Sequence, residues 1–369
     1  MGRLGLYRAT LIIAAAFLIA VTILPVMPVD AWWIRVLDFP RVQIVVLLSI
    51  VMALLAVSGR PRPWLWIGLC ALAFGYQLVR VVPYLAIYPK QATTAESCPV
   101  GQSIRLLASN VLQTNRDYQR TVDIVRAEAP DVFIALEVDQ PWTDALSDLD
   151  DLFAEQHLIP LDNLYGLNLY SRLPLSNVEE RYVVEPDIPS IRADVRLESG
   201  AVIRLFAVHP RPPVPGKDSG ARDAELVLTG REVAETDLPV IVAGDLNDVA
   251  WSDTTRLFQE VAQLLDPRVG RGYFPTFNAH YPLLRWPLDH VFFDDRFGVM
   301  DFERLPATGS DHFPILVTLC YAPSVMAAEQ DEPRADADAL EQADREVADG
   351  VAQQAAEMAE GEDETQIDD

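Results

Sequence analysis

The chain has 369 residues, half of them hydrophobic, and a formal net charge of −25. This charge argues against a protein that holds nucleic acid through a broad basic surface. The charge is uneven, because residues 1–100 carry +5, residues 101–322 carry −16 and residues 323–369 carry −14. We therefore expect a membrane segment, a globular domain and an acidic tail.

Residues 1–90 contain three long apolar stretches, which predict transmembrane helices at about 8–29, 41–58 and 64–88. Trp and Tyr residues gather at the ends of these stretches, as in the aromatic belt of a membrane protein. The alternative for the first stretch is a cleaved signal peptide, which the two apolar stretches that follow disfavour.

The placement of arginines predicts how these helices are oriented. Arg3 and Arg8 precede the first stretch, and Arg60 and Arg62 lie between the second and the third. Positive charge favours the cytoplasmic side, so we expect the N-terminus to be cytoplasmic. Three crossings then place the globular domain outside the cytoplasm, on a multi-pass protein of the inner or plasma membrane.

Two cysteines lie at the ends of the predicted globular domain. Cys98 belongs to a linker, residues 91–100, and Cys320 ends the last predicted strand. An oxidising compartment permits a disulfide between them. The alternative is a pair of free thiols.

Residues 101–322 are long enough for one hydrophobic core. Short apolar runs predict eight strands, at 104–109, 132–136, 167–170, 191–197, 202–208, 240–243, 290–293 and 315–319. Amphipathic stretches predict three helices, at 118–128, 219–234 and 253–264. Many strands with few helices, some strands being neighbours in sequence, indicate a mixed α/β layered sandwich.

The last segment, residues 323–369, is rich in Asp, Glu, Ala and Gln and nearly lacks aromatic residues. This composition predicts a disordered, solvated tail. A weak helical stripe of Leu340, Val347, Val351 and Met358 is the alternative pattern within it.

Three polar clusters stand at the ends of predicted strands. Gly244-Asp245-Leu246-Asn247 follows one apolar run, Leu288-Asp289-His290 opens another, and Gly309-Ser310-Asp311-His312 precedes the last. Acidic, amide and imidazole groups at the ends of buried strands suit metal-assisted hydrolysis. The three clusters therefore predict a hydrolytic site.

Within these clusters, Asp289 and His312 are the expected carboxylate–imidazole pair of a general base, which leaves Asp311 for a metal ion. Asp245 and Asn247 point the same way if the chain stays extended. The alternative for Asp245 is a Gly-Asp turn with local hydrogen bonds. His290 points away from Asp289 along a strand, so we interpret it as structural.

Three further polar residues follow predicted strands. Glu137 is a hard oxygen ligand suited to Mg²⁺, and the alternative is an exposed loop acid. Asn110 is placed to orient a metal-bound water or to touch a phosphate oxygen, and the alternative is a turn residue. His209 precedes the rigid segment Pro210–Pro213, and the alternative is a structural histidine at a strand end.

In this order and spacing, the polar residues resemble the endonuclease/exonuclease/phosphatase superfamily, which includes deoxyribonuclease I, exonuclease III, inositol polyphosphate 5-phosphatases and neutral sphingomyelinases. The resemblance rests on Asn110, Glu137, His209-Pro210 and the three clusters, and Tyr170–Leu175 resembles the "S-R-x-P" strand turn of the superfamily. It covers essentially all of 101–322. It implies a four-layered α/β sandwich, with two packed mixed β-sheets flanked by helices and the site at one rim.

The resemblance also implies a metal site. Glu137 would bind Mg²⁺ or Mn²⁺, with Asn110 and Asp311 near the metal ion. Asp245 would orient or deprotonate the attacking water, and Asn247 would hold a phosphate oxygen.

For the remaining residues, the resemblance implies that the Asp289–His312 pair acts in acid–base chemistry or steadies the pentavalent phosphorane. His209 would stabilise charge in the transition state. Whether Asp245 or His312 is the general base stays open.

The implied reaction is metal-assisted attack of water on a phosphate ester. The leading hypothesis is a membrane-anchored, extracytoplasmic phosphodiesterase or phosphatase that acts on lipid head groups or other envelope phosphoesters. The first alternative is an extracytoplasmic nuclease acting on DNA or RNA, but Lys217 is the only lysine of the domain, which disfavours tight, non-specific binding of nucleic acid. The second is a non-catalytic membrane-bound binding module, which the intact polar set disfavours.

Overall fold

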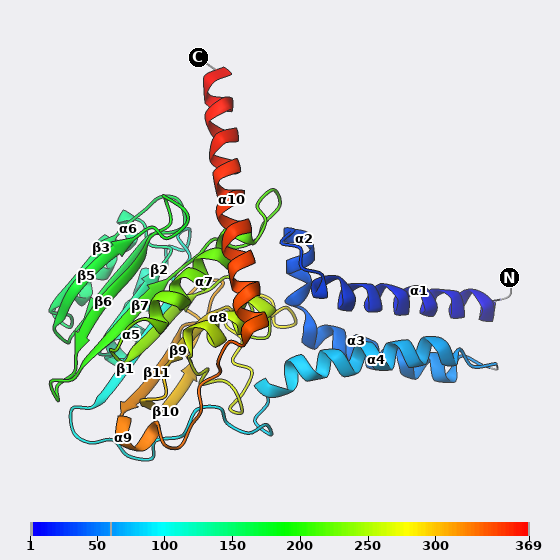
Figure 1. Cartoon of the computed structure of the whole chain (residues 1–369), viewed down its shortest axis with the longest axis horizontal. Helices are drawn as coiled ribbons and strands as arrows, with labels where there is room; N and C mark the ends of the chain where they lie inside the picture. The colour runs from blue at the N-terminus through cyan, green and yellow to red at the C-terminus, as the bar shows by residue number, and fades with distance from the viewer. Residues whose placement is uncertain (1–2, 60, 368–369) are drawn as a thin grey trace.

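The computed structural model describes residues 3–59 and 61–367. Residues 103–321 contain two mixed β-sheets packed face to face (Figure 1). The first sheet has the order β10 (Phe297–Arg304), β11 (Ile315–Tyr321), β1 (Ser103–Asn110), β2 (Val132–Leu136), β4 (Leu167–Ser171) and β3 (Glu155–Ile159). The second has the order β5 (Leu175–Arg181), β6 (Ser190–Arg196), β7 (Val202–Val208), β8 (Val240–Asp245) and β9 (Asp289–Phe293).

The main core lies between the sheets, where alternate residues of β1 and β2, such as Leu106 and Ile134, meet Leu205 and Ile241 of β7 and β8. Burying each such side chain stabilises the fold by roughly 1.5–3 kcal/mol. Helices α5 (Tyr118–Glu128) and α6 (Gln140–Leu146) pack on the outer face of the first sheet. Helices α7 (Gly220–Ala234) and α8 (Asp253–Ala262) pack on the outer face of the second.

Two mixed sheets flanked by helices confirm the predicted α/β sandwich. All eight predicted strands and all three predicted helices are present, with ends within about two residues of those expected. The sequence did not reveal β3, β5, β10 and α6. The Cys98–Cys320 disulfide is present and joins the segment before β1 to β11.

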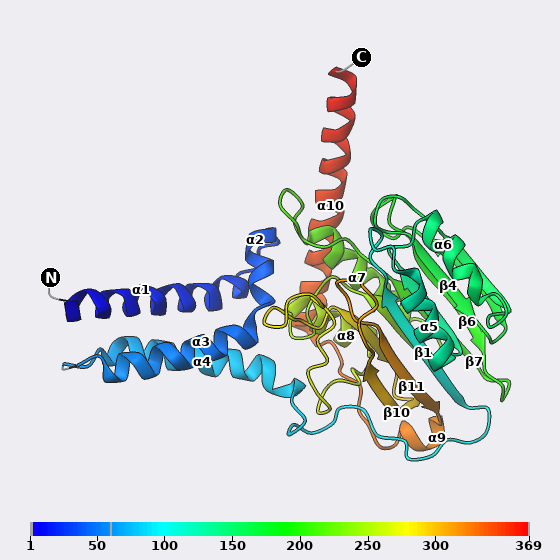
Figure 2. The same ribbon diagram turned by 180° about the vertical axis from the view of Figure 1, so that it is seen from behind.

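The N-terminal helices α1 (Arg3–Ile23), α3 (Arg41–Val57) and α4 (Trp64–Val81) extend side by side from one end of the sandwich (Figures 1 and 2). Two segments, Gly5–Val26 and Trp64–Tyr84, are long and apolar enough to cross a membrane. The span predicted at 41–58 corresponds to a bent pair. Its helix α3 is only 17 residues long, and the helical segment before it, which contains α2 (Trp32–Arg35), is inclined to α3 by 73°. Arg60, used for the predicted orientation, lies outside the described residues.

The C-terminal segment is not disordered over residues 337–367, so that prediction is wrong for this part of the chain. It forms one helix, α10 (Ala337–Ile367), which begins beside α7 and then projects beyond the sandwich (Figure 1). Ala343 and Val347 pack against Val227 and Val261. Ala, Glu and Gln are strong helix formers, so the segment is helical although its apolar stripe is small. The prediction of disorder did not take this helix propensity into account.

Candidate active site

The predicted polar residues meet at one end of both sheets because of the direction of the strands. Asn110 ends β1, Glu137 follows the parallel strand β2, and His209 and Asp245 stand at the ends of the parallel pair β7 and β8. Asp289 begins β9, which runs antiparallel to β8, so it lies directly opposite Asp245. The same end of the first sheet receives the chain that enters β11, which carries Asp311 and His312.

His312 lies between two carboxylates of the second sheet. Its Nδ1 is 2.8 Å from Asp289 Oδ2, and its Nε2 is 3.5 Å from Asp245 Oδ2. All three side chains are buried. Burial opposes the charged imidazole, but Asp289 and Asp245 outweigh it and raise the pKa of His312. Asp289 and His312, which the sequence pairs as carboxylate and imidazole, are therefore in direct contact.

Asn110 connects the two sheets across the site. Its Nδ2 donates to Glu137 Oε1 at 2.8 Å and to Asp245 Oδ2 at 3.1 Å. Its Oδ1 accepts the backbone N–H of Leu112 at 3.0 Å, which is the local bond of a turn residue. Asn110 therefore makes the local bond of a turn residue and also contacts two of the predicted site carboxylates.

Glu137 is held in a left-handed backbone conformation, with φ at 60°. For a non-glycine residue such a conformation costs on the order of 1–3 kcal/mol and is concentrated at functional sites. The N–H of Gln113 donates to Glu137 Oε2 at 3.3 Å. Burial raises the pKa of Glu137, while Asn110 and His312 partly offset this. Glu137 is thus not the exposed loop acid of the alternative interpretation.

His209 is buried beside Asp245, with its Nε2 4.0 Å from Asp245 Oδ2. Its ring centroid is 5.4 Å from that of Tyr165. Burial, with the nearby charge of His312, lowers the pKa of His209 to about 3. His209 is therefore neutral at physiological pH.

Asn247 differs from the extended geometry expected for it, because its φ is 51° and its N–H donates to Asp245 Oδ1 at 2.9 Å. The turn interpretation of Asp245 is thus correct for one of its oxygens, while Oδ2 faces Asn110 and His312. Asn247 Nδ2 donates to Pro210 O at 2.9 Å. Gly244 is required here, since a Cβ at this position would lie 1.9 Å from Val208 O.

The model of the Endonuclease/Exonuclease/phosphatase family matches residues 104–312. The chain belongs to this family. Family members are hydrolases that act on phosphoester bonds and depend on divalent metal ions. No curated protein matches the chain.

Solved structures are similar to this chain, and the two with a TM-score above 0.5 agree with the assignment at the level of the fold. Humanized D. rerio TDP2 carrying 14 mutations has a TM-score of 0.51 and 17% identity, over 59% of this chain and 99% of that one. D. rerio TDP2 complexed with single strand DNA product has a TM-score of 0.51 and 16% identity, over 59% and 98%. The human Nocturnin catalytic domain with bound sulfate has a TM-score of 0.49 and 16% identity, over 60% and 96%.

The acidic residues of this endonuclease/exonuclease/phosphatase domain fit a divalent cation. Asp311 Oδ1 and Asp289 Oδ1 are buried and have no hydrogen-bond donor among the described residues. A buried carboxylate oxygen without a partner is costly, and a hard cation satisfies it. Asp245, Asp289 and His312 bring their possible ligand atoms within 4.8 Å of one another. His312 is a poor ligand there, because its raised pKa keeps it protonated and a ligating imidazole must be neutral.

Several residues that support the site were missed or given no role. Ser310 Oγ donates to Asn110 O at 2.8 Å and accepts the N–H of His312 at 3.0 Å, which fixes the loop before β11. Thr276 Oγ1 accepts the N–H of Asp289 at 3.1 Å, and the ring centroid of Phe277 is 4.9 Å from that of His312. Ser310 lies within a cluster already noted, whereas Thr276 and Phe277 lie in a loop without periodic pattern.

Proposed function

We propose that this chain is a membrane-anchored, Mg²⁺- or Mn²⁺-dependent phosphoesterase that hydrolyses a phosphodiester or a phosphomonoester by attack of water. The observation that carries this proposal is the buried Asp245–His312–Asp289 set, which Asn110 joins to Glu137. Membership of a family of metal-dependent phosphoester hydrolases supports it.

In this proposal Glu137 and Asp311 hold the metal ion, with Asn110 beside it. The bound cation would neutralise charge on a phosphate oxygen and lower the pKa of a bound water. Asp289 keeps His312 protonated, so His312 is the acid that donates to the leaving or developing oxyanion. Asp245 is then the base that accepts the proton of the attacking water, and burial raises its pKa toward the range that suits this role.

Two neutral groups complete the proposed site. His209 presents a neutral imidazole and would stabilise charge on a phosphoryl oxygen by donating a hydrogen bond. Asn247 uses one amide hydrogen on Pro210 O, so the second is the one proposed for a phosphate oxygen.

We further propose that three spans, α1, the bent pair ending in α3, and α4, anchor the domain, residues 101–322, on the outer side of the inner or plasma membrane. Two apolar helices support the anchoring. The Cys98–Cys320 disulfide supports an oxidising compartment. Residues 91–100 link the two parts.

The proposal is tested with the purified full chain in detergent micelles, supplied with Mg²⁺ or with EDTA. The substrates are phospholipid vesicles, plasmid DNA and a single-stranded RNA. We expect Mg²⁺-dependent release of a phosphorylated or dephosphorylated lipid product, lost in Glu137→Ala and retained in the matched variant Glu155→Ala, whose carboxylate is exposed on β3.

Two outcomes would replace the proposal with an alternative. Cleavage of DNA or RNA with untouched lipid would make the chain a nuclease. A Glu137→Ala variant that retained full function in cells would favour a non-catalytic binding module. The net charge of −16 over residues 101–322 is the reason that lipid is preferred to nucleic acid.

A further inference from the structure

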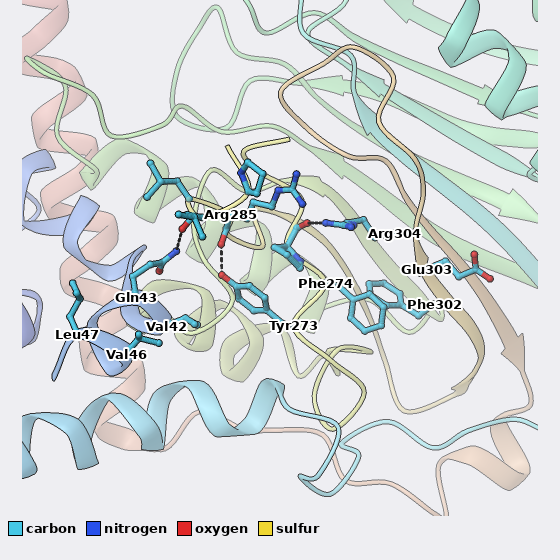
Figure 3. A pocket seen from close by; sticks show the side chains of 14 residues that line it. Val42, Gln43, Val46, Leu47, Tyr273, Phe274, Arg285, Phe302, Glu303 and Arg304 are labelled. Atoms are coloured by element: carbon cyan, nitrogen blue, oxygen red, sulfur yellow. Dashed lines mark hydrogen bonds between the residues drawn. The ribbon is translucent and has the colours of Figure 1, made fainter. Parts of the chain in front are cut away.

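An apolar groove of about 1100 Å³ lies between α3 and the loop that precedes β9 (Figure 3). Its volume lies just above the range of small-ligand sites, roughly 300–1,000 Å³. One wall is formed by α3 and the other by the catalytic domain, and the apolar residues used below are Val42, Val46, Leu47, Tyr273, Phe274 and Phe302. The groove therefore joins a proposed membrane helix to the phosphoesterase domain.

Specific contacts join the two walls and order the domain wall. Gln43 Nε2 on α3 donates to Leu283 O at 2.8 Å, and within the domain wall the Tyr273 hydroxyl donates to Arg285 O (Figure 3). Phe39, just before α3, packs edge-on against Trp286 at 5.7 Å between ring centroids. These contacts hold the groove open as a formed feature of the chain.

The groove is bordered by exposed apolar side chains at the membrane end of the domain. Leu283 is 84% exposed and Tyr281 is 61% exposed, while Val46 on the facing helix is 53% exposed. Neighbouring exposed apolar residues of this kind mark a contact with a partner or a membrane. Because α3 belongs to a proposed membrane span, we expect these exposed apolar side chains to contact the acyl chains of lipids.

Two arginines lie at the domain end of the groove. The guanidinium carbons of Arg285 and Arg304 are 4.9 Å and 4.1 Å from the ring centroid of Phe313. Arg285 donates to the carbonyl of Ala279 at 3.0 Å and Arg304 to that of Pro275 at 3.0 Å. Among the side chains that the structure describes, those of residues 5–59 and 61–359, neither arginine has an ion-pair partner. Two adjacent cations without a counter-ion favour an anionic ligand.

This arginine pair lies at the same rim as the proposed catalytic site. Arg304 ends β10 and pairs with Ile315 of β11, which pairs with Ala108 of β1, two residues before Asn110. Two strand spacings separate Arg304 from Ala108, roughly 10 Å. In addition, the N–H of Ala279 donates to Asp311 O at 2.7 Å. The arginine end of the groove is thus tied directly to the site.

We propose that the groove binds an acyl chain of an anionic phospholipid, with Arg285 and Arg304 drawing its phosphoester head group to the catalytic rim. This inference rests on the proposed function and names the substrate class of that site. Charge complementarity at the arginine end and continuity with α3 at the other favour a lipid over a second copy of the chain.

The test is photolabelling of the full chain in phosphatidylcholine nanodiscs that contain phosphatidic acid with a diazirine in its acyl chain. Labelled peptides are mapped by mass spectrometry in the presence of EDTA. We expect labels concentrated at residues 42–47 and 281–284. An excess of unlabelled phosphatidic acid should reduce them by about tenfold, and the same excess of phosphatidylcholine should not.

Two pairs of variants make the result specific. Leu283→Glu should cut labelling at residues 281–284 by about tenfold, since a carboxylate repels both chain and head group. Because the Leu283 side chain is exposed, we expect the Leu283→Glu variant to fold. The matched control is Leu158→Glu, at an exposed leucine of β3. Arg304→Gln should abolish the preference for phosphatidic acid, whereas the control Arg196→Gln on β6 should retain it.

Labelling spread evenly over α1, α3 and α4, or competition equal for both lipids, would overturn the groove as a binding site. Labelling confined to a partner chain in cross-linked dimers would assign the groove to a second copy and would overturn the proposal too. Because labelling in EDTA needs no turnover, its outcome is independent of whether the chain hydrolyses phosphoesters.

Discussion

His312 Nδ1 lies 2.8 Å from Asp289 Oδ2, so a carboxylate at the start of β9 fixes an imidazole that enters β11 in the opposite sheet. The two residues are 23 positions apart in sequence and both are buried. The bond orients the ring and, with Asp245, favours its charged form. The proposed acid of the reaction therefore depends on the packing of one sheet against the other.

Asp289→Asn should reduce kcat by about 10²–10⁴-fold, because His312 loses both its orientation and its charge stabilisation. The pH–rate profile should also change on its alkaline limb, which a purely structural role would not alter. Asp301→Asn, at an exposed position of β10, is the matched control. A kcat within twofold of the wild type for Asp289→Asn would contradict this role.

Glu137→Gln should weaken Mn²⁺ binding by at least about tenfold, because it removes a proposed anionic ligand. The free ion is measured directly by electron paramagnetic resonance, without substrate. Glu155→Gln should leave the affinity unchanged. Equal affinity in Glu137→Gln and the wild type would place the metal ion elsewhere.

Docking of the C-terminal helix should be sensitive to acid through Glu357. Its carboxylate accepts from Arg211 Nη1 at 2.9 Å and from Lys217 Nζ at 2.7 Å. Burial opposes ionisation, but hydrogen bonds from Arg211, Lys217 and Gln353 lower the pKa of Glu357 to about 2, against 4.5 for a free glutamate. A lowered pKa means that the stabilisation is complete above about pH 4.5 and is lost as the pH falls toward 2.

Amide hydrogen exchange of residues 351–359, corrected for the intrinsic rate, should therefore accelerate between pH 4.5 and pH 2. Glu357→Gln should show the faster exchange already at neutral pH. Glu341→Gln, whose partner Arg345 lies on the same helix, should behave like the wild type. Slow exchange in Glu357→Gln at neutral pH would show that the apolar stripe alone docks the helix.

Removing the disulfide should destabilise the domain. Replacing Cys98 and Cys320 by serine opens a loop of 222 residues, and the free energy of unfolding should fall by about 2–4 kcal/mol. Thermal unfolding of the detergent-solubilised chain, with and without reductant, measures this. An identical midpoint for the wild type under both conditions would contradict it.

The central strands were predictable because their side chains are buried on both faces. Two of them appear in the sequence as unbroken apolar runs, Val132–Leu136 between Asp131 and Glu137 and Val240–Ala243 between Pro239 and Gly244. The strands β3 and β5 lie at sheet edges and carry exposed polar residues, such as Glu155 and Glu179, so neither alternation nor an apolar run marks them. Edge strands are stabilised by their neighbours rather than by their own pattern.

The site could be predicted as a set of residues but not as a geometry. Asn110, Glu137 and Asp245 lie at one rim because each stands at the end of a strand. The ends of these strands can be predicted from the local sequence. The left-handed conformation of Asn247 and the hydrogen bond from the N–H of Asp289 to Thr276 Oγ1 depend on loop packing. Such loops have no period, so their contacts appear only in three dimensions.

The most direct test of the central claim is the Mg²⁺-dependent kcat/KM of the full chain for a small phosphodiester, bis(p-nitrophenyl) phosphate, in wild type, His312→Ala and His157→Ala. His157 lies on β3, outside the site. We predict that His312→Ala falls by at least about 10²-fold while His157→Ala stays within twofold of the wild type. Equal rates for His312→Ala and wild type would show that this buried cluster is not the catalytic centre.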